Sequence, residues 1–239
     1  VSHRSPLPRG WERMYPNFAS AEAVVASENL YFGQYRCDRE AFSATLHPFI
    51  RNTVAAMDFG GSTLNKIYNP FNDLNRRGSI RRTSEVFALA TAVLFQSYVQ
   101  HFAMTPENLT DAPAWAVDFM KAVPTKWDEV KFIDGYPGQY VVLARRAGNK
   151  WYYVGINASP ESRTVEVDLP AGNYTLYSDT VEPATVKAAR KFHGKKAPLT
   201  LEPRQTTAAT FIGAREDRTH KGGTVKVSIP CTGGFVIVQ

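Results

Sequence analysis

The stretch QYVVLARRAGNKWYYVGINA (139–158) decides how the second half of the chain folds. Valine and aromatic residues, which favour strands, fill both of its halves, and the side-chain pattern here turns to a period of two. Gly148-Asn149 stands in the middle, where a hairpin needs residues that accept a left-handed backbone. We therefore predict a β-hairpin whose turn is at residues 148–149.

The same pattern continues toward the C-terminus. RTVEVDLPAGNYTLYSD (163–179) repeats it, with Pro170-Ala171-Gly172 as the predicted turn, and APLTLEPRQTTAATFIG (197–213) and GTVKVSIPCTGGFVIVQ (223–239) follow. Strands that recur at intervals of roughly ten residues are typical of an all-β fold. We predict an antiparallel β-sandwich domain over residues 125–239, which are enough to bury a core of their own.

Residues 1–124 have a different character, because short apolar runs there alternate with helical patterns. The run within 44–61 ends in Met57-Asp58-Phe59 and predicts a buried strand that delivers an acid to a loop. Helices are predicted over 82–103, with Thr83 or Ser84 as the cap, and over 107–124. Strand, loop and helix is the repeating unit of a (β/α)8 TIM barrel.

A closed barrel needs eight such units, and residues 1–124 supply two or three. We therefore predict an α/β plus all-β chain: the C-terminal units of a catalytic barrel over 1–124, followed by the β-sandwich over 125–239. We also expect a missing N-terminal part of the same protein to complete the barrel.

Composition excludes several classes of function. The net charge is +6, and much of it lies in NRRGSIRR (75–82) and KAARKFHGKK (187–196), which lack the interleaved aromatics of nucleic-acid sites. We read both clusters as solvated loops and expect no nucleic-acid partner. No run of eighteen apolar residues occurs, so no membrane span is predicted. Cys37 and Cys231 have neither zinc-ligand nor disulfide-framework spacing and read as buried thiols.

The candidate chemistry lies among the first sixty residues. Glu22 and Glu28 stand six apart among small and apolar residues. An apolar setting disfavours the charged carboxylate, which suits a general acid, and paired carboxylates also suit Ca²⁺. A solvated helix face is the alternative. Asp58 is expected at the functional end of a barrel strand, or in a structural role there, and Trp11 could stack on a sugar ring.

Several motifs in order resemble glycoside hydrolase family 97. They are RGWERMYPNFASAEAVVASEN (9–29), TLHPFIRNTVAAMDF (45–59) and RTSEVFALATAVLFQS (82–97), and the hairpin stretch is similar to the start of the family's C-terminal β-domain. The resemblance covers nearly the whole chain. It implies an exo-acting α-glycosidase, an α-galactosidase or an α-glucosidase, that removes terminal α-linked sugars from oligosaccharides in the periplasm or outside the cell.

The resemblance also implies roles for single residues. The position of Glu28 is the proton-donating acid, and Glu22 and Glu28 approach a catalytic Ca²⁺. His3 matches a histidine that contacts the sugar. His47 departs from the family pattern, in which an apolar residue precedes Pro48.

Arg4, which follows His3, bears on the mechanism. Inverting members have a glutamate base there and retaining members a glycine, so Arg4 matches neither. Arginine cannot act as a base, which favours the retaining α-galactosidase-like subgroup. Its nucleophile would lie upstream of Val1, and we expect the 239 residues alone to be inactive. The alternative is a non-catalytic carbohydrate-binding or structural remnant of such an enzyme.

Overall fold

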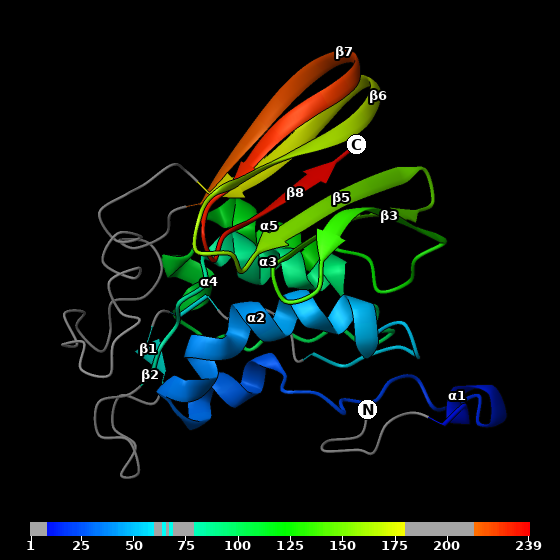
Figure 1. Cartoon of the computed structure of the whole chain (residues 1–239), viewed down its shortest axis with the longest axis vertical. Coiled ribbons are helices and arrows are strands. Elements are labelled where there is room, and N and C mark those ends of the chain that lie inside the picture. Colours follow the sequence, from blue (N-terminus) through cyan, green and yellow to red (C-terminus); the bar gives the residue numbers. More distant parts are fainter. Residues whose placement is uncertain (1–8, 60–63, 66, 69–78, 180–212) are drawn as a thin grey trace.

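The computed structural model describes residues 9–59, 64–65, 67–68, 79–179 and 213–239. In Figure 1 an antiparallel sheet forms one layer, and helices lie against one of its faces. The helix α1 lies at the far side of the helical layer from the sheet. His3, Arg4, the basic cluster 187–196 and nearly all of the predicted strand 197–213 lie outside the described residues.

The elements have the following bounds. The helices are α1 (Trp11–Met14), the 3-10 helix η1 (Ser27–Phe32), α2 (Gln34–Ile50), α3 (Glu85–Leu94), α4 (Asn108–Asp111) and α5 (Ala114–Ala122). The strands are β1 (Ile67–Tyr68), β2 (Ser79–Ile80), β3 (Glu129–Tyr136), β4 (Tyr140–Ala147), β5 (Lys150–Asn157), β6 (Arg163–Asp179), β7 (Gly213–Ile229) and β8 (Gly234–Val238).

The predicted hairpin at 148–149 is confirmed. β4 and β5 pair from Tyr140↔Asn157 to Ala147↔Lys150, which leaves Gly148 and Asn149 as the turn. Gly148 has φ +59°, a left-handed value that glycine adopts without strain. The strands follow the order β3-β4-β5-β8-β6-β7, and every neighbouring pair is antiparallel. The antiparallel prediction is therefore also confirmed.

The predicted turn at 170–172 is wrong. β6 runs unbroken through these residues, and its partner is the equally long β7. The register passes from Leu169↔Gly223 to Ala171↔Lys221, so Pro170 makes no ladder pair. Proline has no N–H to donate, which suits it to a bend in a strand as well as to a turn. Pro170 therefore marks a bend in a strand that continues.

That bend lets one continuous sheet enclose a core. The second half of β6 bonds to β8, whereas Arg163 in its first half stacks on the ring of Tyr140 in β4. The first half of β6 thus crosses over the face of β4. Packing between the two layers is sandwich-like, although the strands β3 to β8 form one sheet instead of two. The enclosed core consists of Tyr140, Val142, Ala144, Tyr153, Val165, Val167, Leu169, Tyr174, Leu176, Val227, Ile229, Phe235 and Ile237.

The other face of the sheet packs against helices. Alternate residues of β4, Val141 and Leu143, point to this side, where they meet a larger core that includes the wholly buried α3. The strand predicted within 44–61 is wrong up to residue 50, because α2 continues through Pro48. Ala44 and Thr45 extend the buried stripe of that helix, so packing maintains it although β-branched residues and proline are poor helix formers.

The other two helix predictions hold in part. The Ser84 hydroxyl caps α3 by accepting from Phe87 N–H at 2.9 Å, as expected. The helix ends at Leu94 instead of 103, because Phe95 adopts an extended conformation. The helix predicted over 107–124 is divided into α4 and α5 before Pro113, and α5 ends shortly before Pro124.

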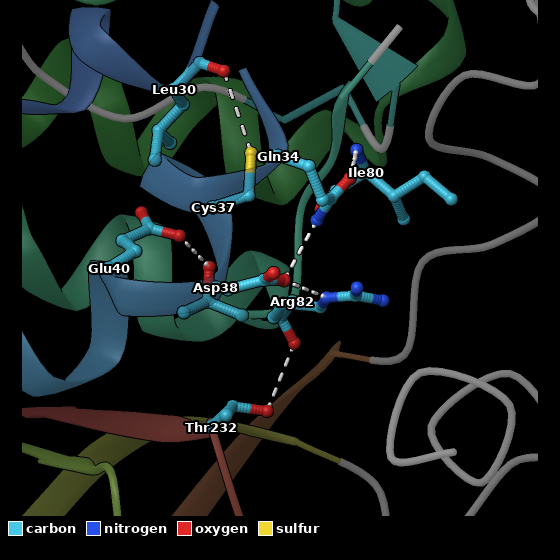
Figure 2. A network of polar contacts seen from close by, with 9 residues as sticks. Leu30, Gln34, Cys37, Asp38, Glu40, Ile80, Arg82 and Thr232 are labelled. Atoms are coloured by element: carbon cyan, nitrogen blue, oxygen red, sulfur yellow. Dashed lines mark hydrogen bonds and ion pairs between the residues drawn. The ribbon is translucent and has the colours of Figure 1, made fainter. Parts of the chain in front are cut away.

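A polar junction joins the helical layer to the β-strands. It consists of Asp38 and Glu40 of α2, the segment 81–85, and Asp179 and Thr232. Figure 2 shows how Arg82 reaches Asp38 in one direction, while its carbonyl accepts from the Thr232 hydroxyl in the other. The distances are 2.7 and 3.0 Å.

This junction corrects the prediction of a solvated loop at the end of NRRGSIRR. Arg81 and Arg82 are buried, and Arg81 forms a 3.0 Å ion pair with Glu85 in which both side chains are fully buried. Burial alone would lower the pKa of Arg81, but Tyr68, Glu85 and Glu40 around it outweigh that effect and raise it. Cys37 and Cys231 are buried, as predicted.

No helix in the described part of the chain is long and apolar enough to cross a membrane. The described residues include one parallel bridge, Ala21↔Met57, but they do not form a closed barrel. The (β/α)8 assignment and the boundary between residues 124 and 125 stay predictions.

Candidate active site

Two carboxylates follow neighbouring parallel segments. Ala21 and Met57 form the parallel bridge, and Asp58 N–H donates to the Ala21 carbonyl at 3.1 Å. Glu22 and Asp58 are the next residues in each segment, so both come at the carboxyl end of a strand-like stretch. Both are buried, at 4% and 8% exposure. In parallel α/β architectures this end is where catalytic groups gather.

Glu28 follows Ser27, which is hydrogen-bonded to the residue after Asp58. Ser27 donates twice to the Phe59 carbonyl, through its N–H at 2.8 Å and its hydroxyl at 3.0 Å. Phe59 directly follows Asp58, so the start of η1 is tied to the end of the second segment. We call Glu22, Glu28 and Asp58 the acidic edge. Glu22 lies outside any helix, so the alternative of a solvated helix face is wrong.

The loop between the two glutamates contains a strained residue. Ala23 has φ +48°, a left-handed value that costs a non-glycine residue about 1 kcal/mol or more. Strain of this kind persists when the surroundings over-determine the backbone, and it gathers at functional sites.

Arg51 connects the two segments through their backbone carbonyls. Its guanidinium is buried and donates to the carbonyls of Ala21 at 2.7 Å, Ala56 at 3.2 Å and Ala55 at 3.1 Å. Burial lowers the pKa of Arg51, and the nearby Glu12 opposes this. These bonds pair Arg51 with the backbone, as part of the frame that sets the acidic edge.

An aromatic cluster forms around Phe59, the residue that follows Asp58. The rings of Phe59 and Phe95 are 4.4 Å apart, and the His47 ring lies 6.1 and 6.2 Å from them. His47 is buried, and desolvation lowers its pKa to about 4, although the Val25 backbone acts in the opposite direction. Its imidazole is therefore neutral near pH 7. The sequence identified His47 only as a departure from the family pattern. It did not indicate that His47 packs against Phe59 and Phe95.

The structure gives less information about sugar binding by Trp11 and Asp58. Trp11 lies in α1, and its ring packs edge-on against Phe18 at 5.9 Å, so its contact with sugar stays a prediction. His101 approaches Asp58, with 3.8 Å between Nδ1 and Oδ1. The cavity beside Asp58 has a volume of about 10 Å³, which is too small for a sugar ring.

Metal binding by these residues can be judged from their donors. Within the described residues, no group of three or more His, Cys, Asp or Glu side chains is placed to hold a metal ion. Ca²⁺ takes six to eight oxygen ligands. Glu22 and Glu28 have the right donor chemistry, but they supply only part of such a shell.

Comparisons with known proteins add independent information. The family described as "Glycosyl-hydrolase 97 C-terminal, oligomerisation" matches residues 126–238. The chain is 31% identical over 179 residues to a probable retaining alpha-galactosidase of Streptomyces bingchenggensis, which covers 75% of the chain and 25% of that protein. It is 28% identical to a retaining alpha-galactosidase of Bacteroides thetaiotaomicron, over 98% of the chain and 32% of that protein.

Solved structures agree with these matches. A beta-arabinopyranosidase is 44% identical and superposes with a TM-score of 0.81, over 99% of this chain and 33% of that one. A family 97 enzyme of Pseudoalteromonas sp. strain K8, solved with acarbose, has a TM-score of 0.66 at 23% identity, over 96% and 32% of the two chains. The latter similarity concerns the fold alone. The chain thus spans about a quarter to a third of the length of these relatives.

Proposed function

Since the chain belongs to glycoside hydrolase family 97, we propose that it supplies the proton donor of a retaining, exo-acting glycosidase. In this proposal the helical part contains the last units of a (β/α)8 barrel, and the sheet forms the β-domain that follows it. The observation that carries the proposal is the acidic edge, where the start of η1 is tied to the segment that ends in Asp58.

Glu28 is the general acid in this proposal. Protonated, it donates to the glycosidic oxygen as the bond to the anomeric carbon breaks, and the aglycone leaves as an alcohol. A second carboxylate, from a part of the enzyme outside these 239 residues, forms the glycosyl–enzyme ester. Glu28, now a carboxylate, removes a proton from the water that cleaves this ester and is thereby restored. Asp58 contacts the sugar.

Calcium is the proposed cofactor. Glu22 and Glu28 would hold the ion together with oxygen ligands from elsewhere in the enzyme. A bound Ca²⁺ supplies positive charge that polarises oxygen atoms at the reacting centre. The part of this chain is to present the two carboxylates, which the left-handed Ala23 and the Ser27 contacts keep at the edge.

The proposed substrate is a terminal sugar of galacto configuration. β-L-Arabinopyranose has the ring stereochemistry of α-D-galactopyranose and lacks only the hydroxymethyl group at C5. One pocket shape therefore serves both the retaining alpha-galactosidases and the beta-arabinopyranosidase to which the chain is similar. We propose the β-L-arabinopyranoside as the preferred substrate, because that similarity is the largest of those given above, at 44% identity.

Two alternatives are less well supported. An α-glucosidase activity rests on the acarbose-bound structure, which at 23% identity supports the fold alone. A non-catalytic remnant would have no need to retain the bonds between Ser27 and Phe59, the neighbours of Glu28 and Asp58 in the sequence. We place the enzyme in the periplasm or outside the cell, where oligosaccharides are its substrates.

The test uses the full-length protein that contains this chain. Hydrolysis of aryl β-L-arabinopyranoside, α-D-galactopyranoside and α-D-glucopyranoside is measured with Ca²⁺ and with a chelator. We expect cleavage of the first two, loss of activity with the chelator, and a first product of retained anomeric configuration by NMR. Cleavage of the glucoside alone, or of none of the three, would contradict the substrate proposal.

Glu28→Gln tests the acid. On a substrate with a poor leaving group we expect kcat/KM to fall by about 10²–10⁴-fold, and by much less on an activated aryl glycoside. Glu107→Gln, at an exposed glutamate, is the matched control and should keep wild-type rates. Equal losses on both kinds of substrate would indicate that Glu28 is not the acid.

A further inference from the structure

A groove in the β-strand layer has no part in the proposed active site. It lies between the turn that joins β3 to β4 and the loop that joins β5 to β6, and its volume is about 620 Å³. Sites for small ligands have volumes of about 300–1,000 Å³. It shares no residue with the acidic edge. The polar side chains that line it are those of Gln139, Ser159, Glu161, Ser162, Arg163 and Thr164.

The walls of this groove are fixed in place. Asn157 is fully buried, and its amide donates to the Glu161 carbonyl at 2.8 Å and accepts from Ser159 N–H at 2.9 Å. The same amide nitrogen donates to the Ile229 carbonyl at 3.2 Å. Ala158 N–H donates to the Gln139 carbonyl at 2.6 Å, which joins the two sides. A preformed groove loses little entropy when a ligand enters it.

The Arg163 guanidinium is held in place at the groove and has N–H groups that can donate to a ligand. Its guanidinium lies 3.9 Å from the centre of the Tyr140 ring, and the Tyr140 hydroxyl is itself fixed to Asp134 at 2.9 Å. Within the described residues Arg163 forms no ion pair, and its buried Nε has no hydrogen-bond partner. A guanidinium stacked in this way keeps its planar N–H groups oriented toward a ligand.

A second groove differs in this respect. It is of similar size, about 520 Å³, and is lined by Asn173, Asp217 and Arg218 among others. There, Arg218 donates to Glu216 at 2.6 Å, and Asp217 accepts from Thr175 at 2.7 Å. Arg218 and Asp217 are therefore already paired within the chain, which makes Arg218 a suitable control.

We propose that the groove at Arg163 is an accessory site for a neutral polysaccharide chain. The ligand follows from the mixture of groups: Arg163 and Gln139 bring donors and Glu161 and the hydroxyls bring acceptors, as the hydroxyl pairs of a sugar ring require. The carboxylate of Glu161 disfavours an anionic polymer. The site would hold the polymer whose terminal sugars the enzyme removes, and so raise their local concentration. This step rests on the proposed function.

Binding is tested with galactomannan as the probe, by electrophoresis of the full-length protein in native gels that contain the polymer. The background is Glu28→Gln, which prevents hydrolysis during the run. We expect galactomannan to retard the protein, and the double variant Arg163→Ala/Gln139→Ala to remove most of the retardation. Arg218→Ala in the second groove should behave as the background does. Retardation that survives the double variant, or equal retardation by polygalacturonate, would overturn the proposal.

Kinetics in the wild-type background separates this inference from the proposed function. The double variant should raise KM for galactomannan about 100-fold, the lower end of the range that tethering provides, while an aryl galactoside too small to span both sites keeps its kcat/KM. Equal losses on polymer and aryl substrate would contradict an accessory site. If no glycoside is cleaved but the gels give the expected pattern, the groove stands and the proposed activity fails.

Discussion

Two regions of this chain bury charged side chains, and they do so in opposite ways. At the polar junction each charge has its own side-chain partner: Arg81 with Glu85, Arg82 with Asp38, and Glu40 with Thr83. At the acidic edge the arginine of the frame, Arg51, instead donates to three backbone carbonyls. The junction pairs its charged groups with side chains, two of them as ion pairs, whereas the contacts at the edge fix the backbone that carries its carboxylates.

This difference separates stability from function. A buried charge that is paired inside the protein contributes to stability through that pair. Removing its partner leaves an uncompensated buried charge, which is strongly destabilising. The ties at the edge instead fix the backbone that carries Glu22, Glu28 and Asp58, the carboxylates proposed to act on a substrate or an ion. We therefore expect substitutions at the junction to change the free energy of unfolding and substitutions at the edge to change kinetics.

The largest expected effect is at the junction. Arg81→Met leaves Glu85, which is fully buried, without its ion pair and should cost about 3–5 kcal/mol of unfolding free energy. Urea denaturation of the full-length protein measures it. The control is Arg81→Met/Glu85→Leu, which removes both charges and should recover most of the loss. A double variant as unstable as the single one would show that shape, not charge matching, governs this region.

The next effect concerns His47 and depends on pH. Its pKa is about 4 in the folded chain, against about 6.5 when unfolded, so between these values only the unfolded state binds the proton. Stability should therefore be unaffected above pH 6.5, fall by about 3 kcal/mol as pH drops toward 4, and change no further through this group below that.

His47→Phe keeps an aromatic ring against Phe59 and Phe95 and should flatten the stability curve between pH 6.5 and 4. The measurement is denaturation of the full-length protein at a series of pH values. Phe95→Leu is the control, since it weakens the same cluster but retains the imidazole. It should lower stability at every pH without changing the slope. An unchanged slope in His47→Phe would assign the acid sensitivity to other groups.

At the acidic edge, Asp58→Asn should change kinetics more than stability. Loss of one charged contact to the sugar is expected to lower kcat/KM about 10- to 100-fold, which corresponds to about 1.5–3 kcal/mol. The unfolding free energy should change by less than in Arg81→Met. The reverse result, a large loss of stability with kcat/KM intact, would give Asp58 the structural role that the sequence left open.

How far the sequence could predict the fold depends on how local each signal is. The hairpin at Gly148-Asn149 lies within twenty residues of sequence, and the structure matches it pair for pair. Pro170-Ala171-Gly172 and Pro48 have the residue types of a break, yet packing continues the strand and the helix through them. The partner of β6 starts at Gly213, too far along the chain for any local pattern to indicate.

The same argument applies to the charged residues. The sequence predicts a solvated Arg82 because its partner, Asp38, is 44 residues away along the chain. Glu22 and Glu28 could be selected by resemblance, but their relation to Asp58 depends on the Ala21↔Met57 bridge and on the Phe59 carbonyl. These are long-range contacts, which composition and periodicity do not encode.

The smallest effect compares one strained residue in each region. Ala23 at the edge and Thr232 at the junction are the non-glycine residues of positive φ within the described part of the chain. Ala23→Gly should relieve left-handed strain and stabilise the fold by about 0.5–1 kcal/mol, because no side-chain bond is lost. Thr232→Gly relieves similar strain but removes the hydroxyl that donates to the Arg82 carbonyl, so its net effect should be near zero.

Kinetics completes this last comparison. The strain at Ala23 lies between Glu22 and Glu28, so greater freedom there should lower kcat/KM a few-fold even as stability rises. Thr232→Gly should leave kcat/KM unchanged. If Ala23→Gly gains stability and keeps full activity, the left-handed loop serves only to connect two segments. If it loses activity, the strained backbone is part of how this chain holds two carboxylates at one edge.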